Sequence, residues 1–262
     1  MSALTGATLV VADLDGTLTF TAGAPEPQIL AAWDALLDTR GVRVALATAR
    51  SPRCVRRWFG DRTGRIDLVC CNGALVIPTQ GSVSWEPLPV PALHRVLTRL
   101  AADRAGYCLE YGDHFVASDP TALPWMGDHH RRVLAPGEGH RTEGVVKVSV
   151  DSGRAAHRAA TGLRGVQVLA HATGDADIVR AGVGKEVAVA SLRRPGERLV
   201  ALGNDENDRG LLWAADRAYL VGTGLRDLDA APHVRRVTAA PSAVTAVLRD
   251  LTAPSGRLTS AR

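Results

Sequence analysis

Two aspartates lie two residues apart in the segment DLDGT, as Asp13 and Asp15. In an extended chain this spacing directs both carboxylates to the same side, and Gly16 lets the backbone turn away after them. Two carboxylates held this close repel each other unless a cation or a shared proton relieves the repulsion. An EF-hand loop starts with the same spacing, but its further ligands are absent here. The pair therefore predicts a site for a cation or a shared proton, or else a simple cap on a turn.

Polar residues also follow three other apolar segments of the chain. Thr48 ends VRVALAT directly before a helix start, where a hydroxyl beside free backbone N–H groups suits a phosphate. Asn72 ends IDLVCCN, which is an unremarkable position by itself. The segment GNDENDRG is an acidic cluster that either binds a cation or only caps a helix, with the residues Asn204, Asp205, Glu206, Asn207 and Asp208.

The elements that must position these residues alternate between strand and helix. Continuous apolar runs predict buried strands at 7–14, 42–48, 66–74 and 198–203, with further strands at 217–222 and 235–239. Helical spacing predicts helices at 27–41, after Ser51 and Pro52, and at 185–192, 206–215 and 242–251. This alternation is typical of an α/β fold with a doubly wound, Rossmann-like parallel sheet, in which ligands bind at the carboxyl ends of the strands.

The middle of the chain follows a different pattern. We expect a hairpin at 75–85, a proline-rich hinge at 87–94, and a helix with Leu93, Val96, Leu97 and Leu100 on one face. Two strands around a Gly-Asp turn at 107–118, an irregular loop at 120–132, a strand at 145–150, a helix at 155–163 and a strand at 166–172 would follow. The predicted domains are therefore a core of residues 1–79 and 181–262 and an inserted smaller α/β cap of residues 80–180.

The composition is that of an ordinary globular protein, with 262 residues, 46% hydrophobic and 22% charged. No apolar run predicts a membrane span, and no secretion signal is visible. The four cysteines show no CxxC spacing, which predicts reduced thiols and a cytoplasmic location. A net charge of +4 and a pI near 9.2 raise nucleic acid as a partner. The scattered arginines and the 4% aromatic content argue against it.

Together these motifs resemble those of the haloacid dehalogenase superfamily, and specifically its Cof-type phosphatases. DLDGTLT is similar to the nucleophile motif, TAR to the threonine motif and CNGA to the asparagine-glycine turn. DIVRAGVGKEVAV resembles the lysine segment and GNDEND the acidic metal motif, and the inserted block falls where these phosphatases carry their cap. The resemblance covers nearly the whole chain and is specific to the family, though not to any substrate.

The resemblance implies Mg²⁺-dependent hydrolysis of a phosphomonoester through an aspartyl phosphate. It implies that Asp13 is the nucleophile, that Asp15 is the general acid and base, and that Thr48 and Lys185 complete the catalytic set. The implied metal ligands are Asp13, the carbonyl of Asp15, Asn204 and Asp208. The implied phosphate and substrate contacts are Leu14 through its backbone, Thr48, Ala49, Arg50, Asn72, Lys185 and Asn207.

Lysine is rare in this chain, because only Lys147 and Lys185 interrupt a set of 31 lysines and arginines. An ammonium is a compact point charge, whereas a guanidinium is a wide planar fork. A crowded site between two carboxylates and a phosphoryl group therefore favours the lysine at 185 that the resemblance assigns to it. Lys147 either reaches the site from the cap or lies exposed.

Asn204 departs from the family pattern, which usually has an aspartate after this glycine. We expect either direct but weakened coordination by Asn204, with Asp208 helping from outside the ligand shell, or a shift of one residue that makes Asp205 the ligand. The departure also keeps open a catalytically silent protein that binds a phosphorylated metabolite. A phosphotransferase or mutase is a further alternative within the superfamily.

Substrate choice is expected to lie with the cap. The candidates there are Glu110, His114, Asp128, His129, His130 and Lys147, with Arg50 on the core side. The size of the cap favours a small phosphorylated metabolite, most simply a sugar or polyol phosphate, with neither nucleic acid nor membrane as partner. The oligomeric state is left open by the sequence.

Overall fold

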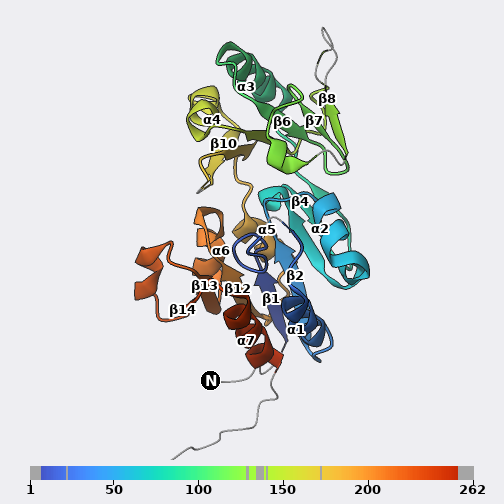
Figure 1. The fold of residues 1–262 in the computed structure, drawn as a ribbon, viewed down its shortest axis with the longest axis vertical. Coiled ribbons are helices and arrows are strands. Elements are labelled where there is room, and N and C mark those ends of the chain that lie inside the picture. Colours follow the sequence, from blue (N-terminus) through green and yellow to red (C-terminus); the bar gives the residue numbers. More distant parts are fainter. Residues whose placement is uncertain are drawn as a thin grey trace, which may run out of the picture.

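The computed structural model of the chain describes residues 7–21, 23–127, 130–133, 139, 141–171 and 173–252. These residues form two β-sheets, each with its own helices (Figure 1). The chain starts in one sheet, builds the other, and returns to the first for its last three strands. The second α/β unit is therefore an insertion into the first.

The larger sheet has eight strands in the order β14-β13-β12-β1-β2-β3-β4-β5. The strands from β14 to β3 run parallel, and β4 and β5 add an antiparallel edge. Their bounds are β1 Thr8–Ala12, β2 Val42–Ala47, β3 Asp67–Cys70, β4 Leu75–Ile77, β5 Ser84–Trp85, β12 Arg198–Gly203, β13 Arg217–Val221 and β14 Val234–Val237.

Helices cover both faces of this sheet because its central strands are apolar on both sides. Val10 and Ala12 of β1 belong to the cluster that includes the buried faces of α1, α2 and α7, whereas Leu9 and Val11 pack with α5 and α6. The sheet is thus doubly wound, as its continuous apolar runs predict. The helices are α1 Pro27–Leu37, α2 Pro52–Phe59, α5 Lys185–Leu192, α6 Arg209–Ala214 and α7 Pro241–Thr252.

The smaller sheet has six strands in the order β10-β11-β9-β6-β7-β8, with every pair antiparallel except β7 and β8. The helices α3 Val90–Ala102 and α4 Gly153–Ala160 pack on one face through an apolar cluster. The strands are β6 Tyr107–Glu110, β7 Phe115–Ala117, β8 Arg131–Val133, β9 Lys147–Val150, β10 Val166–Ala170 and β11 Ala176–Arg180. Five 3₁₀ turns are described, at η1 Gly60–Arg65, η2 Cys71–Gly73, η3 Pro124–Met126, η4 Glu206–Asp208 and η5 Arg226–Ala230.

The predicted α/β architecture, with a parallel sheet and a second smaller unit, is confirmed. Two short strands were missed: β11 was assigned no element, and β8 lies in a segment expected to be an irregular loop. The chain passes from the larger sheet to the smaller unit between Trp85 and α3, and it returns between Arg180 and Lys185. The division of the chain at 79/80 and 180/181 stays a prediction.

All four cysteines, Cys54, Cys70, Cys71 and Cys108, are free thiols, as expected. Within the described ranges, every helix is too short or too polar to cross a bilayer. The cytoplasmic location itself stays a prediction.

Candidate active site

The carboxyl end of β1 carries the two aspartates. Asp13 directly follows the strand and is 5% exposed, while the side chain of Asp15 is 45% exposed. Leu14 between them is buried, and its carbonyl accepts hydrogen bonds from the amides of Leu18 and Thr19. Gly16 has φ 76°, so the turn after the aspartates needs the left-handed backbone that glycine adopts freely.

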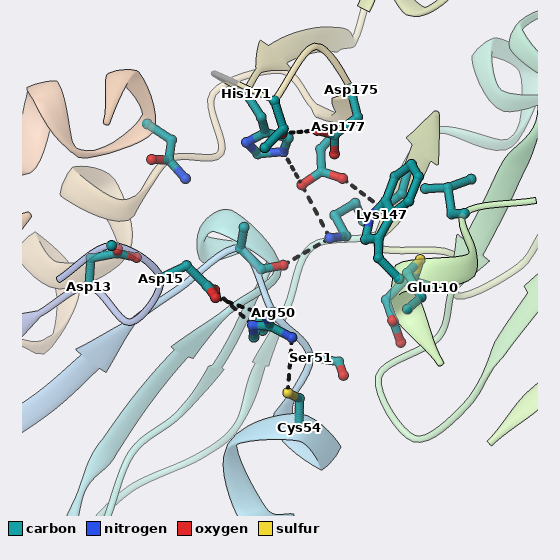
Figure 2. A pocket seen from close by; sticks show the side chains of 18 of the residues that line it. Asp13, Asp15, Arg50, Ser51, Cys54, Glu110, Lys147, His171, Asp175 and Asp177 are labelled. Atoms are coloured by element: carbon teal, nitrogen blue, oxygen red, sulfur yellow. Dashed lines mark hydrogen bonds and ion pairs between the residues drawn. The ribbon is translucent and has the colours of Figure 1, made fainter. Parts of the chain in front are cut away.

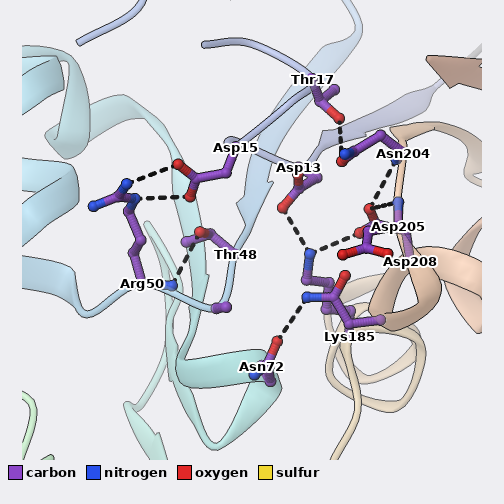
Figure 3. A network of polar contacts seen from close by, with 12 residues as sticks. Asp13, Asp15, Thr17, Thr48, Arg50, Asn72, Lys185, Asn204, Asp205 and Asp208 are labelled. Carbon is purple, nitrogen blue, oxygen red and sulfur yellow. Dashed lines mark hydrogen bonds and ion pairs between the residues drawn. The ribbon is translucent and has the colours of Figure 1, made fainter. Parts of the chain in front are cut away.

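An arginine that follows β2 holds Asp15. The Arg50 guanidinium makes two hydrogen bonds to the Asp15 carboxylate, at 2.7 and 2.8 Å (Figure 3). Thr48 is fully buried after β2, and its hydroxyl accepts from the Arg50 amide at 3.1 Å. The threonine therefore shapes the backbone that brings Arg50 to Asp15.

Lys185 links the segment after β1 to the loop after β12. Its ammonium donates to Asp13 Oδ1 and to Asp208 Oδ1, both at 2.7 Å (Figure 3). The side chains of Lys185 and Asp208 are wholly inaccessible, and that of Asp13 is 7% exposed. One inaccessible cation thus lies between two carboxylates, the crowded environment that favours an ammonium over a guanidinium.

Burial and charge oppose each other in this group. Burial and the nearby charge of Asp208 raise the pKa of Asp13 to about 7, although the Lys185 ammonium lowers it. Burial alone would lower the pKa of Lys185, but the charges of Asp13 and Asp208 outweigh it and hold that pKa above its usual value. Lys185 is therefore protonated at neutral pH, whereas Asp13 needs more positive charge to be fully ionised.

The acidic loop after β12 places Asn204 inside and Asp205 at a turn. The Asp205 carboxylate caps the turn η4 by accepting from the Glu206 amide at 2.8 Å. Asp208 Oδ2 accepts from the amides of Asn204 and Asp205, at 2.9 and 3.2 Å. The Asn204 amide faces Asp13 and the carbonyl of Asp15. The geometry thus favours the expected register, in which Asn204 and not Asp205 faces the aspartates.

The donor set around Asn204 is suited to a hard cation. One terminal atom of its amide lies 3.1 Å from Asp13 Oδ2 and 2.9 Å from the Asp15 carbonyl oxygen. Octahedral Mg²⁺ with bonds near 2.1 Å spaces neighbouring oxygens by about 3.0 Å. No cluster of three His, Cys, Asp or Glu side chains suited to a metal occurs in the part of the chain described. A cation here would therefore depend on one carboxylate, one carbonyl and one amide oxygen, and the residues present fit that set.

A second polar network links this site to the cap. Asn207 donates to Asn72 Oδ1 at 3.0 Å, and Asn72 donates to Asp177 Oδ2 at 2.8 Å. Lys147 donates to the same oxygen at 3.1 Å and to the carbonyl of Ala49 at 2.8 Å (Figure 2). The predicted residues Asn72, Ala49 and Lys147 thus form the junction between core and cap, and Lys147 is buried rather than exposed.

The charges in this network stabilise one another. Burial raises the pKa of Asp177, but Lys147 and His171 lower it further, so the net pKa lies below the usual value. Burial would lower the pKa of His171, but its hydrogen bond to Asp177 at 3.1 Å and the charge of that carboxylate raise it. The network therefore favours an ionised aspartate beside two cationic partners.

A cavity of about 720 Å³ opens between the two units, and Asp13, Asp15 and Asn204 line it. Among the cap candidates, Glu110 and Lys147 line this cavity, whereas His114 and His130 do not. Asp128 and His129 lie outside the described residues. Cavity residues that were not predicted from the sequence include Arg53, Arg57, Trp58, Trp125, His171, Asp175 and Asp177.

The missed residues include the second contact between core and cap. Arg53 of α2 donates to both carboxylate oxygens of Glu110 in β6, at 2.5 and 2.6 Å. Glu110 is 1% exposed. Glu110 was among the predicted cap candidates, whereas no sequence pattern singled out Arg53.

Comparison with known families agrees with this geometry. Residues 10–144 match the model of the haloacid dehalogenase-like hydrolases. The chain belongs to this family. No curated protein sequence matches it.

Solved structures share the fold across nearly the whole chain. SMU.1108c from Streptococcus mutans UA159 has a TM-score of 0.79 at 18% identity, covering 93% of this chain and 98% of its own. The phosphatase BT1666 from Bacteroides thetaiotaomicron has a TM-score of 0.74 at 18% identity, covering 94% and 95%. The subclass IIB sugar phosphatase BT4131 has a TM-score of 0.75 at 14% identity, covering 92% and 98%. The inserted cap is therefore part of a shared architecture.

Proposed function

We propose that this hydrolase is a Mg²⁺-dependent phosphatase of a small phosphomonoester that works through an aspartyl phosphate. The observation that carries the proposal is Asp13, held against the buried Lys185 at the base of a cavity that Asp15 and Arg50 also line. A carboxylate oriented by an ammonium beside a second, exposed carboxylate suits nucleophilic catalysis with a separate proton donor.

The chemistry then takes two displacements at phosphorus. A carboxylate oxygen of Asp13 forms a bond to phosphorus while the bond from phosphorus to the alcohol oxygen breaks, and Asp15 gives that oxygen its proton. Asp15 next accepts a proton from water as the water oxygen attacks phosphorus and releases Asp13. Because Arg50 holds both oxygens of Asp15, one of its two hydrogen bonds must yield when Asp15 carries the proton.

Asp13, the carbonyl of Asp15 and Asn204 would hold Mg²⁺. When bound, the ion supplies positive charge that favours the ionised form of Asp13 and offsets its repulsion of the phosphate. Asp208 would act indirectly, since both of its oxygens already accept hydrogen bonds from Lys185 and from the loop backbone.

The transferring phosphoryl group would be bound by residues of the strand ends. Asn207 lines the cavity and supplies a polar side chain, the buried Lys185 and Thr48 would supply charge and a hydroxyl from beneath it, and the backbone of Leu14 would supply an amide. Asn72 orients Asn207 through their hydrogen bond of 3.0 Å. In this assignment, residues that follow four different strands would form one phosphate site.

The cap would select the substrate. A cavity of about 720 Å³ suits a small metabolite. Its cap side mixes positive and negative groups, among them Lys147, His171, Glu110 and Asp175, with the apolar side chains of Leu123, Trp125 and Met126. Alternating donors and acceptors match the hydroxyl groups of a sugar or polyol phosphate better than an apolar ester.

Phosphate release from a panel of sugar, polyol and nucleoside phosphates, assayed in MgCl₂ and in EDTA, tests the proposal. Asp13→Asn should abolish turnover and the acid-stable label on the Asp13 peptide, because the amide keeps the shape but is not a nucleophile. Asp61→Asn, the same change at an exposed position, is the matched control. Circular dichroism checks that both variants fold.

Each outcome of the panel separates the alternatives. Asp13→Asn activity within tenfold of the parent would refute the nucleophile. Substrate binding without turnover would favour a silent binder, which the neutral Asn204 motivates. Transfer of phosphate to added alcohols in preference to water would favour a phosphotransferase.

A further inference from the structure

The Asn204 amide makes an unusual set of contacts at the cation site. The terminal atom that faces the aspartates lies within 3.1 Å of three oxygens, namely Asp13 Oδ2, the Asp15 carbonyl and Thr17 Oγ1. Figure 3 shows the contact with Thr17. The opposite terminal atom lies over Gly16, where a Cβ would come within 2.3 Å of it. The amide is therefore held in one plane, and either of its two ends can face the oxygens.

With its nitrogen inward, the amide donates to Asp13 at 3.1 Å, to Asp15 at 2.9 Å and to Thr17 at 3.1 Å. With its oxygen inward, it accepts from the Thr17 hydroxyl at 3.1 Å but lies against the Asp15 carbonyl, which has no proton to give, and against Asp13 Oδ2, which has none when Asp13 is ionised. Buried polar atoms are costly when they face like charge without a donor. The inward nitrogen is thus favoured while the site holds no cation.

A divalent cation reverses this preference. Oxygen atoms about 3.0 Å apart repel each other when no cation lies between them. The same spacing separates neighbouring ligands around octahedral Mg²⁺. Only the inward oxygen can serve as a ligand, because an amide nitrogen has no lone pair to offer. The two ends of one side chain are therefore suited to two states of the same site.

We propose that the Asn204 amide is a rotating stand-in for the cation. In the metal-free protein its NH₂ group bridges Asp13 and the Asp15 carbonyl, and on Mg²⁺ binding it turns by half a revolution so that its oxygen becomes a ligand. An aspartate at this position could not do this, since it has no donor. The inference rests on the Mg²⁺ dependence of the proposed function. The asparagine would stabilise the metal-free site and lower its affinity for Mg²⁺.

Side-chain NMR can observe the rotation directly. The chain has three asparagines, Asn72, Asn204 and Asn207, so ¹⁵N-asparagine labelling yields three NH₂ pairs. The pair that disappears in Asn204→Asp is that of Asn204. Titration of the metal-free parent with MgCl₂, without substrate, should move this pair furthest and speed its exchange with water, because the NH₂ group leaves its three acceptors.

Thermal unfolding of variants gives an independent test. In EDTA at pH 8.5, above the raised pKa of Asp13, Asn204→Asp should melt below both the parent and Asn204→Ala, because its carboxylate would face the ionised Asp13 without a shared proton. In saturating MgCl₂ it should gain more than the parent. Its Kd for Mg²⁺ by calorimetry should fall roughly tenfold, since ligand charge tunes such sites.

Asp205→Asn is the matched control, because it removes a neighbouring carboxylate that caps η4 and does not face the aspartates. Its melting temperature should fall, but the gain on adding Mg²⁺ should equal that of the parent. An Asn204 pair that Mg²⁺ leaves unmoved, or an Asn204→Asp variant as stable as the parent in EDTA, would overturn the inference. Neither result depends on turnover, so a failure of the phosphatase assay with a moving Asn204 pair would refute only the proposed function.

Discussion

Replacing Lys185 by methionine tests the centre of the site. The change keeps an unbranched side chain, one heavy atom shorter, but removes a cation that lies 2.7 Å from both Asp13 and Asp208. Both carboxylates are buried, so they lose their shared partner without gaining water. Breaking a buried ion pair in this way costs about 3–5 kcal/mol, a large part of the 5–15 kcal/mol by which domains are typically stable.

The cost should also depend on pH. Burial and Asp208 already raise the pKa of Asp13 to about 7 with the lysine present, against 3.8 in a free side chain. A folded-state pKa above the unfolded value means that stability falls as pH rises between the two. Without the lysine this pKa rises further, so Lys185→Met should lose less stability at pH 6 than at pH 8.

The assay is urea unfolding in EDTA at both pH values, because bound Mg²⁺ would replace part of the missing charge. Arg226→Met, which removes an exposed cation, is the control and should change stability by less than about 0.5 kcal/mol. The double variant Lys185→Met/Asp208→Asn should recover part of the stability but none of the phosphate release. A loss below about 1 kcal/mol for Lys185→Met at pH 8 would refute the account of a buried, charged triad.

Two further predictions concern the contacts between core and cap. Arg53→Met should lower the free energy of unfolding by about 3–5 kcal/mol, because it leaves Glu110 buried without its cation. The double variant Arg53→Met/Glu110→Gln should recover most of that loss. Equal urea midpoints for the single and double variants would contradict this. The pKa of His171 is raised above 6.5 by Asp177, so its contribution is full below pH 6.5 and is lost as pH rises through the raised value. The gap in unfolding free energy between the parent and His171→Gln should therefore shrink from pH 5.5 to 8.5, and a gap that widens would show that the charged imidazole does not stabilise the junction.

The core half of the site could be predicted from the sequence because strand ends were enough to locate it. Asp13, Thr48 and Asn72 follow β1, β2 and β3, and Asn204 follows β12. Parallel strands that run side by side bring their carboxyl ends to one edge, so four separate sequence positions become neighbours without knowledge of side chains. The scarcity of lysine then pointed to Lys185, which the structure buries between two carboxylates.

The cap half could not be predicted in the same way. Its polar face depends on antiparallel register, which places Lys147 opposite Glu110 and Ser149 opposite Asp177. Strand β11 was missed because ADIVR carries a buried aspartate, which lowers its resemblance to a strand. Residue type alone did not show which cap histidine belongs to the site. His171 contacts Asp177, whereas the expected His114 contacts its neighbour Asp113.

The burial of both lysines has a practical consequence for chemical labelling. Lys147 is 6% exposed and Lys185 is 1% exposed, so neither ε-amine of the folded chain is open to an acylating reagent. Lys147 becomes reactive when the junction between the carbonyl of Ala49 and Asp177 separates, and Lys185 only when the core itself opens. Peptide mapping after timed acylation would therefore report two different motions from one sample, with the cap acylated first and the core last.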